Sequence, residues 1–395
     1  MKETFEKIYN NFEKTKNICE FYNKYEKNMT STRFLLIRSL DKENLKEVIK
    51  LYSNFDNTGN LKTLTEKTYN SPVTVEQLLN YIENKRKELI KKRESELEGL
   101  SEILDNFPIV NCGVRNDKVD DIVKTFVRNK SLKTMLEIET ELNKEILPRI
   151  KQYSLWSYYN QTSNDIIELF FLKHPSVIPT IRKIPNVDFF IKIEGNIIPF
   201  DLKFTNISDS YFDLASQGII RNNNNTIYDD FYIDEHSDTN ELKKIKSYYN
   251  TFKRNHKSLK LPNMSGLKKN DLIELLTDTN IQEALTFVEN ILSQHSNYIP
   301  TTTDELYALE WWNYKYQGER LFCNNNRLFV FLAYKNKLID GRELKGRTTE
   351  IGNKIKKLLD NLTMNDIHTI HYHYDKDMSL IGDYTALSLS TIYYE

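Results

Sequence analysis

The spacing of apolar residues predicts that the first part of the chain is helical. Apolar residues recur every three or four positions, the period of an amphipathic helix, in stretches separated by polar breaks. We expect the third stretch to begin at Ser71-Pro72 and Pro148 to end the fourth. The stretches cover residues 4–26, 41–52, 71–104 and 118–147. Residues 1–150 are therefore predicted to form a helical domain, serving either DNA contact or dimerisation.

The pattern changes after Pro148. Short runs typical of strands alternate with longer stretches of helical period. The strand-like runs cover residues 187–193, 197–205, 328–334 and 367–374, and the helical stretches cover 165–173, 271–292, 303–322 and 348–362. Such a mixture predicts an α/β or α+β domain with a mixed sheet over residues 151–395.

A tight hairpin is predicted between the first two strand-like runs. A two-residue turn at Gly195-Asn196 would set Asp188 opposite Lys203, and side chains alternate along each strand. One face of the hairpin is then wholly apolar. The other face carries Asp188, Asp201 and Lys203 at the end away from the turn. A three-residue loop would instead place the two aspartates on opposite faces.

The three charged residues suggest metal-assisted chemistry on a phosphodiester. Two neighbouring carboxylates repel each other unless a cation lies between them, and hard oxygen ligands suit Mg²⁺. Lys203 would stabilise charge developing on a phosphate or lower the pKa of a metal-bound water. The alternative interpretation is a solvated strand face with an Asp/Lys pair.

The same residues resemble the signature of a known family. Asp188 is followed, after twelve residues, by Asp201-Leu202-Lys203, which is similar to the motif of the PD-(D/E)XK nuclease superfamily. This superfamily includes most type II restriction endonucleases. A helix before the two strands often carries a glutamate, and Glu168 stands at such a place.

The resemblance implies a restriction-endonuclease-like mixed sheet flanked by helices. It implies that Asp188 and Asp201 bind Mg²⁺, that Glu168 assists, and that Lys203 positions the attacking water. The family's proline usually stands directly before the first acid, whereas Val187 stands there in this chain. Glu168 also suits the exposed stripe of an ordinary helix.

Charge is segregated along a chain whose formal net charge is only −1. Residues 206–236 are acidic, whereas residues 237–269 carry nine Lys and Arg against two acids, with aromatic residues interleaved. This basic segment suits nucleic acid, and it equally suits a basic amphipathic helix whose aromatic residues face the core. A later loop adds further cations, which are either DNA contacts or ordinary loop charges. The candidate DNA-binding residues are Lys243, Lys244, Lys246, Lys253, Arg254, Lys257, Arg342 and Arg347.

Other sequence features bear on compartment and cofactors. Three widely spaced cysteines suggest neither a disulfide framework nor a cysteine-based zinc site, and no signal peptide or membrane-spanning run is apparent. We therefore expect a soluble, cytoplasmic protein. His371, His373 and Asp375 share one face of a predicted strand, where a zinc site and an exposed strand face are both possible readings. Glycine-rich phosphate loops are absent from the sequence, so no nucleotide cofactor is expected.

These features together predict a type II restriction endonuclease that hydrolyses double-stranded DNA with Mg²⁺. By the same resemblance we expect a homodimer, because two-fold symmetry suits cutting both strands. Two alternatives remain open: another nuclease of the superfamily, acting in defence, in repair or on RNA, and a non-catalytic nucleic-acid-binding protein.

Overall fold

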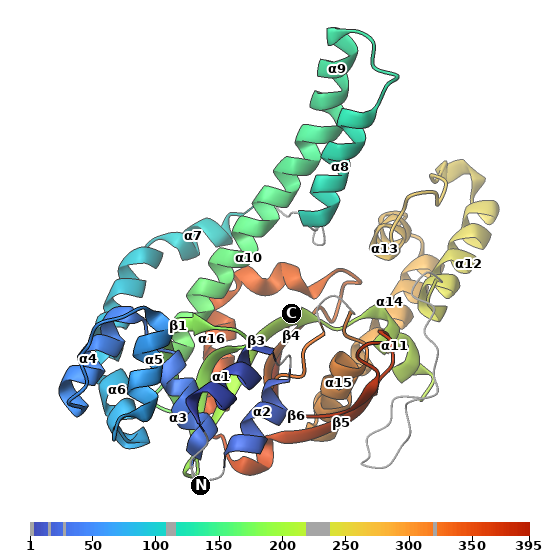
Figure 1. The fold of residues 1–395 in the computed structure, drawn as a ribbon. Coiled ribbons are helices and arrows are strands. Elements are labelled where there is room, and N and C mark those ends of the chain that lie inside the picture. Colours follow the sequence, from blue (N-terminus) through green and yellow to red (C-terminus); the bar gives the residue numbers. More distant parts are fainter. Residues whose placement is uncertain (1–3, 15–16, 27–28, 108–115, 219–237, 319–321) are drawn as a thin grey trace.

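A six-stranded mixed sheet forms the centre of the molecule, with helices on both faces (Figure 1). The computed structural model describes residues 4–14, 17–26, 29–107, 116–218, 238–318 and 322–395. The strands are β1 (Val177–Ile184), β2 (Val187–Ile193), β3 (Asn196–Asn206), β4 (Arg327–Ala333), β5 (His368–Tyr374) and β6 (Gly382–Tyr394). Their order is β1-β2-β3-β4-β6-β5. β1, β2 and β3 are antiparallel, β3, β4 and β6 are parallel, and β5 is antiparallel to β6.

The N-terminal helices cover one face of the antiparallel half of the sheet. Their apolar stripes pack in one core with Ile178, Phe190 and Ile197 of the first three strands. These helices are α1 (Phe5–Lys14), α2 (Ile18–Tyr25), α3 (Thr30–Arg38), α4 (Lys42–Tyr52), α5 (Leu61–Asn70) and α6 (Val75–Leu97). α6 begins after a capping box formed by Thr74 and Gln77, not at Ser71-Pro72, because the reciprocal hydrogen bonds of that box satisfy the free amides of the first turn.

The other helices complete the layers. α10 (Leu147–Lys173) and α16 (Thr348–Asp360) pack on the opposite face, over the core of β2, β3 and β4. α11 (Asp209–Ser216) and α15 (Thr303–Lys315) pack beside β4, β5 and β6, and Trp311 and Trp312 of α15 are buried there. No helix in the described part of the chain is long and apolar enough to cross a membrane.

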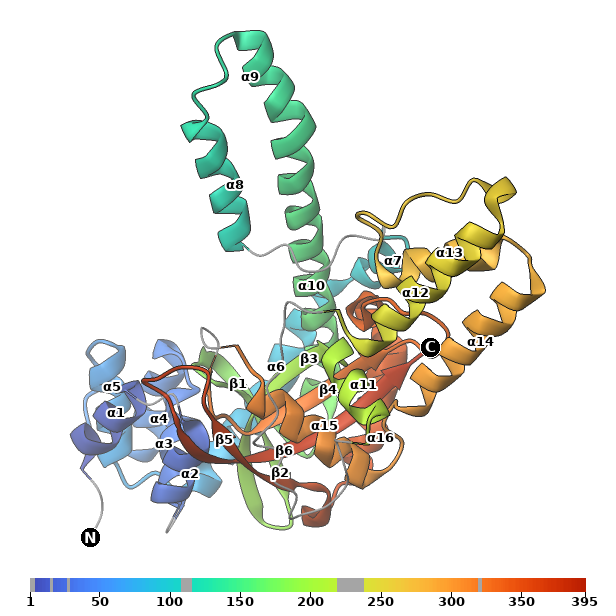
Figure 2. The same cartoon turned by 90° about the vertical axis from the view of Figure 1, so that its right-hand side faces the viewer.

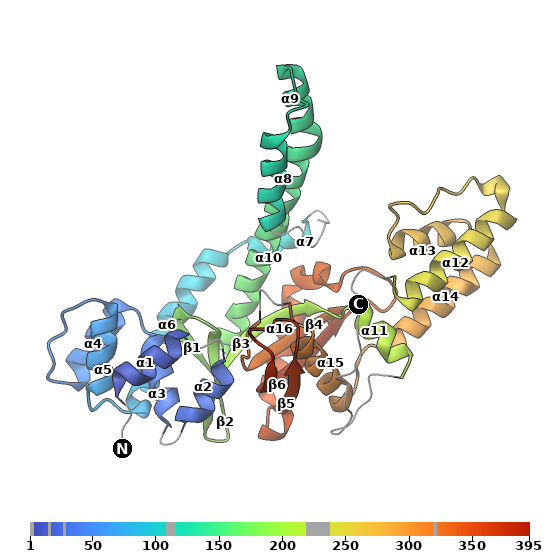
Figure 3. The same ribbon diagram turned by 45° about the vertical axis from the view of Figure 1, so that its right-hand side comes forward.

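A helical arm projects from the body (Figures 1 and 3). α7 (Leu100–Asp105) leads towards it, and it consists of α8 (Asn116–Arg128), α9 (Met135–Glu141), a π-helix at Leu142–Ile146 and the first part of α10. The prediction that Pro148 ends a helix is wrong: Pro148 lies in the first turn of α10. A proline is tolerated in a first turn, where its missing N–H removes no essential bond, and the wide π-turn directly precedes it.

A separate helical lobe follows β3 in the chain. It consists of α12 (Asn240–Asn255), α13 (Lys269–Asp278) and α14 (Gln282–Asn297), which share their own core. The single helix predicted over residues 271–292 is therefore two helices, and Asn280 takes a left-handed conformation at the break. The arm and the lobe extend towards the same side of the sheet in every view (Figures 1 to 3).

All four predicted strands are present, within two residues at each end, and two further strands were not predicted. β1 contains Pro179, which argues against a central strand; the structure accommodates it because β1 is an edge strand. β6 interleaves serine and threonine with apolar residues and lies between β4 and β5. The expected mixture of helices and a mixed sheet is confirmed.

Candidate active site

The hairpin that positions the aspartates turns one residue earlier than predicted. Ile193 pairs with Asn196, so the turn residues are Glu194 and Gly195, with φ angles of 46° and 85°. Both angles are positive, as a type I′ turn requires. The register differs from the predicted one by two residues, so the side-chain alternation is preserved. Continued beyond the Phe189–Phe200 pair, this register sets Asp188 opposite Asp201 rather than opposite Lys203.

The two faces of the hairpin are both covered near the turn. The predicted apolar face is buried beneath α10 and α16, except that Val187 joins the core under the N-terminal helices. The other face also buries Phe190 and Ile197 beneath those helices. Lys192 is exposed near the turn, and the candidate residues lie at the end away from it.

Asp188 stands where β2 separates from β3. The regular backbone pairing ends at Phe189–Phe200, and Oδ2 of Asp188 accepts a hydrogen bond from the Leu202 amide at 2.8 Å. The Asp188 carboxylate thus accepts the hydrogen bond that a backbone carbonyl would accept if the pairing of β2 and β3 continued. Burial, followed by the negative charges of Asp201 and Glu168, raises the pKa of Asp188 to about 6, against the lowering effect of the Leu202 amide.

Asp201 lies beside an arginine that the sequence did not single out. Asp201 pairs with Arg327 across the parallel strands β3 and β4, and Arg327 Nε lies 3.4 Å from Asp201 Oδ2. Arg327 is almost fully buried and also donates to Oε1 of Gln317 at 3.2 Å. No local pattern marks Arg327, because its pairing with Asp201 spans more than a hundred residues of chain.

Lys203 follows Asp201 on the same face of β3. Its side chain reaches solvent, yet the surrounding protein lowers its pKa by removing part of its hydration. The positive charges of Arg327 and Arg342 lower this pKa as well, whereas Asp201 raises it. Lys203 and Arg327 line a cavity of about 360 Å³ between β3, β4 and α15. A lysine with a lowered pKa beside open space is suited to proton transfer or to contact with an anion.

Glu168 lies on α10 and faces a different cavity. Together with Asp188 it lines a space of about 90 Å³ between α6, α10, β1 and β2. Burial raises the pKa of Glu168, and Lys183 of β1 opposes this shift from 3.8 Å away. The negative charge of Glu168 raises the pKa of Asp188. The ion-pair partner of Glu168 is Lys183. Sequence patterns did not mark Lys183.

The donor set fits a divalent cation in part. Asp188 and Asp201 are neighbouring carboxylates, and the pKa of Asp188 is raised first by burial and then by the charges of Asp201 and Glu168. Two carboxylates are enough for Mg²⁺ when water and substrate phosphate complete its shell. In the described ranges, however, no three His, Cys, Asp or Glu side chains gather closely enough to hold a metal ion. Glu168 therefore does not complete a three-carboxylate cluster in this arrangement.

The basic segment forms α12, and its aromatic residues lie in the lobe core. Tyr249 and Phe252 are buried, and Tyr248 stacks on Phe287 with ring centroids 3.7 Å apart. The cations occupy other positions of the helix: Lys243, Lys244 and Arg254 are exposed, and Lys246 and Lys253 are half-buried. Lys257, just after the helix, is exposed as well. Lys246 pairs with Asp238 at 2.6 Å, and Lys253 donates to Oδ1 of Asn263 at 2.7 Å. The amphipathic helix is thus confirmed, and its outer face is cationic.

The two loop arginines already have acidic partners within the chain. Arg342 Nε donates to Oδ1 of Asp340 at 3.0 Å, and Arg347 Nε lies 2.9 Å from Glu395 Oε1. A DNA contact by either residue would have to share or replace these ion pairs. Lys345, between them, is buried and donates to Asn160 at 2.6 Å.

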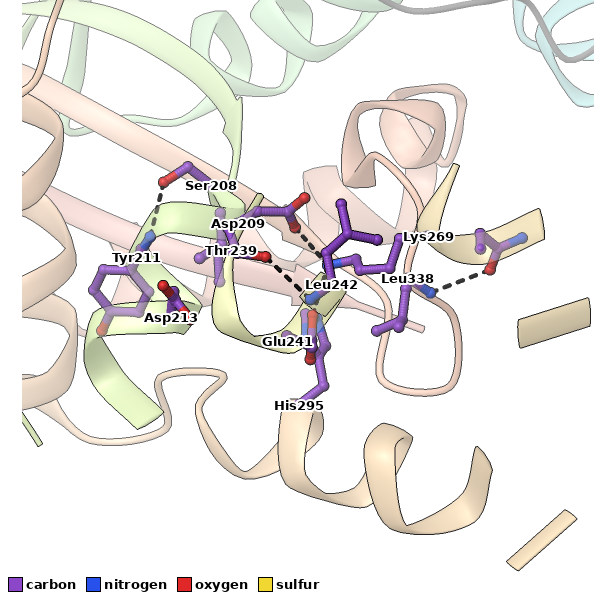
Figure 4. A network of polar contacts seen from close by, with 12 residues as sticks. Ser208, Asp209, Tyr211, Asp213, Thr239, Glu241, Leu242, Lys269, His295 and Leu338 are labelled. Atoms are coloured by element: carbon purple, nitrogen blue, oxygen red, sulfur yellow. Dashed lines mark hydrogen bonds and ion pairs between the residues drawn. The ribbon is translucent and has the colours of Figure 1, made fainter. Parts of the chain in front are cut away.

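A network of charges, buried except at Asp209, joins the lobe to the sheet body (Figure 4). Lys269 of α13 lies 2.7 Å from Asp209 of α11 and 2.6 Å from Glu241 of α12. Nδ1 of His295 on α14 lies 3.2 Å from Glu241. Burial opposes ionisation of Glu241, but His295 and Lys269 outweigh it and lower the pKa of Glu241 to about 2. The same acids raise the pKa of Lys269 against the effect of burial.

The remaining candidates do not form a metal site among the described residues. His371 contacts Thr385, His373 contacts Asp383, and Asp375 pairs with Lys315. This arrangement is that of a strand face with local partners. Cys19 and Cys323 are free thiols, whereas Cys112 and most of the acidic segment over residues 206–236 lie outside the described residues.

The comparisons with known proteins add no relative. No family model, curated protein or solved structure matches this chain. The functional argument therefore depends on the residues and on their arrangement.

Proposed function

We propose that this chain is a Mg²⁺-dependent nuclease of the PD-(D/E)XK type that cuts double-stranded DNA. One observation carries the proposal. Where β2 separates from β3, the Asp188 carboxylate accepts a hydrogen bond from the Leu202 amide of β3, which lies between Asp201 and Lys203. The order of the sheet, an antiparallel hairpin continued by parallel strands, and the helix α10 behind it agree with a restriction-endonuclease-like fold.

We call the place where β2 separates from β3, with Asp188, Asp201 and Lys203, the fork. Each residue near the fork has its own part in the proposed chemistry. Asp188 and Asp201 would hold Mg²⁺, which supplies a water of lowered pKa and neutralises charge on the phosphate. Lys203, two residues after Asp201 on the same face of β3, would orient the attacking water and contact the phosphate from the cavity that it lines with Arg327. Arg327 holds Asp201 in place and adds positive charge beside it. Glu168 acts through its charge on Asp188.

The lobe supports a nucleic-acid substrate. Exposed cations line the outer face of α12, while the aromatic residues of the same helix hold the lobe together. Lysines and arginines that neutralise phosphates supply most of the affinity of a protein for DNA. Nine of the 55 Lys and Arg residues lie in residues 237–269 against two acids, so the near-neutral total does not oppose binding at this segment.

The more specific role is a type II restriction endonuclease that acts as a cytoplasmic homodimer. The absence of nucleotide-binding loops from the sequence agrees with an enzyme that needs only Mg²⁺. Another nuclease of the superfamily, acting in defence, in repair or on RNA, would use the same residues.

A non-catalytic nucleic-acid-binding protein is the second candidate. Arg327 favours it, because its ion pair with Asp201 neutralises one of the two carboxylates without a metal. In that case α12 binds and the fork residues only stabilise the sheet.

Cleavage of unmethylated phage DNA in Mg²⁺ or in EDTA distinguishes these candidates. We expect discrete fragments with Mg²⁺ and intact DNA with EDTA. Lys203→Ala should slow cleavage at least ~100-fold and leave DNA affinity nearly unchanged, as loss of one stabilising donor does in other enzymes. Lys192→Ala, which removes an exposed lysine from the neighbouring strand, is the matched control and should cut normally.

Each other outcome has a definite meaning. A smear of fragments would indicate a nuclease without a fixed site. Cleavage of RNA alone would identify the substrate as RNA. Binding without cleavage, unaffected by Mg²⁺, would favour the non-catalytic protein and exclude the proposed enzyme.

A further inference from the structure

The arm exposes apolar side chains that it cannot bury by itself. The burial of its side chains is described from residue 121 to residue 150, and among the apolar residues there only Ile146 is buried. Val127, Met135 and Leu136 are 66%, 67% and 75% exposed. Val123 and Leu147 are exposed as well. Large apolar side chains gathered on one projection of a protein mark a surface that another molecule covers.

The geometry of the arm limits what that molecule is. α8 packs against the π-helix and α10, so the arm is a two-helix hairpin. It stands away from the sheet and from the lobe in all three views (Figures 1 to 3). A hairpin of two amphipathic helices buries both apolar stripes when it meets a second pair of helices, as in a four-helix bundle.

The charges of the arm favour a second copy of the same hairpin. Residues 116–133, which comprise α8 and the loop after it, carry five basic residues against three acids, a net charge of +2. Residues 134–146, on the α9 side, carry four acids against one lysine, a net charge of −3. In a two-fold symmetric pair, the α8 side of one copy can lie against the α9 side of the other, so opposite charges meet twice.

DNA is a poorer occupant of this surface. Over residues 116–146 the two sides together carry six basic residues against seven acids, a net charge of −1, and such a surface gains little from phosphate contacts. The apolar residues at the tip of the arm, Met135 and Leu136, have no counterpart in a phosphate backbone.

We propose that two copies of this chain associate through their arms, with the α8 side of each against the α9 side of the other. The arms then form a four-helix bundle in which Val127, Met135 and Leu136 are buried. Each sheet body, with its fork of β2 and β3, lies at the base of its own arm. This pairing does not depend on the proposed nuclease activity, because it needs neither metal nor DNA.

The first test is the mass of the full chain in solution, measured by light scattering at micromolar concentration without DNA or Mg²⁺. We expect the mass of two chains. Met135→Lys/Leu136→Lys should give the mass of one chain with unchanged circular dichroism, because both side chains are exposed in the single copy. Met378→Lys, at a residue that is 93% exposed on the sheet body, is the control and should remain a dimer.

The second test addresses the proposed orientation by charge reversal. One variant carries Arg128→Glu and Lys130→Glu on the α8 side, and the other carries Glu139→Lys and Glu141→Lys on the α9 side. Each variant alone should associate more weakly than the wild type. An equimolar mixture should recover the dimer, because each reversed side then meets an opposite charge on its partner.

A wild-type chain that stays monomeric at every concentration would overturn the inference, and so would a dimer that survives the double lysine change. If the wild type dimerises through the arm but the mixture of the two charge-reversal variants does not recover the dimer, the proposed orientation is excluded. Loss of cleavage with an intact dimer, or cleavage by a monomer, would separate this inference from the proposed function.

Discussion

Asp188 is a carboxyl group in surroundings that favour its protonated form. Its folded-state pKa of about 6 lies above the ordinary value of 3.8, because burial and two neighbouring acids oppose its charge. The folded state therefore binds this proton more tightly than the unfolded chain does. The resulting stabilisation is present in full below pH ~4 and is lost as the pH rises through about 6.

Asp188→Asn tests this directly, since Asn can still accept the hydrogen bond from Leu202. In EDTA at pH 8 we expect its free energy of unfolding in urea to exceed that of the wild type by about 1–2 kcal/mol, and to match it near pH 4. Mg²⁺ should then stabilise the wild type and leave the variant unchanged. Asp278→Asn, an exposed control on α13, should show neither effect. A stability difference that does not depend on pH would contradict the proposed cause.

The sequence located the hairpin residues of the candidate site because they lie close together in the chain. The alternation of side chains and the D-x-K spacing are local, so Asp188, Asp201 and Lys203 could be predicted to share one end of a hairpin. Arg327 and Lys183 come from β4 and β1, and their nearness depends on the pairing of strands. No single-sequence pattern carries that information.

At the scale of elements, the position of the hairpin turn was predicted wrongly by one residue, and the difference has a structural cause. Glycine and asparagine tolerate a positive φ better than glutamate does, so the sequence favoured Gly195-Asn196. The structure places Glu194 in the left-handed region instead, and Oε1 of Glu194 accepts a hydrogen bond from the Met364 amide at 3.2 Å. This hydrogen bond to the segment before β5 stabilises Glu194 in a conformation that glutamate does not favour by itself.

Gly195→Ala should destabilise the protein through backbone strain alone. The φ of Gly195 is +85°, and a Cβ built there meets no atom within 4 Å. We expect a loss of about 1 kcal/mol in the free energy of unfolding, measured in urea. Gly318→Ala is the matched control, because Gly318 has equal space around it and no positive φ. Equal losses for both variants would show that strain at the turn is not the cause.

Long-range packing decided most of the other differences at this scale. β1 was missed because proline argues against a strand, and only the sheet order reveals that it is an edge. α10 was divided at Pro148 because the π-turn that precedes the proline leaves no mark in the sequence. Element types with a strong period were predicted well, whereas their ends and their partners depended on contacts between distant segments.

For the whole molecule, a network of charges inside the lobe, with Asp209 of α11 at its exposed edge, helps to attach the lobe to the sheet body. Lys269 is 7% exposed and compensates Glu241, so Lys269→Met leaves a buried acid with only His295 beside it. We expect a loss of about 2–4 kcal/mol, with faster hydrogen exchange over α12 to α14 than over the sheet. Adding Glu241→Gln should recover part of the loss. Uniform exchange over the whole chain would contradict a local role for the network.

Acid should loosen the same attachment. The pKa of Glu241 falls from 4.5 to about 2 in the folded protein, so its contribution to stability is complete above pH 4.5 and is lost as the pH falls towards 2. Exchange over the lobe should therefore rise in this range before exchange over the sheet does.

The helix that runs from Met135 through the π-turn to Lys173 has a mechanical consequence. Its Met135 end is the tip of the arm, and Glu168 lies near its other end, ~50 Å away at the rise of an α-helix. The Glu168 end of this helix packs against α6 and α16 in the body, and the π-helix is the irregular point between the body and the tip. A molecule bound at the tip is therefore joined by one continuous helix to the residue whose charge raises the pKa of Asp188.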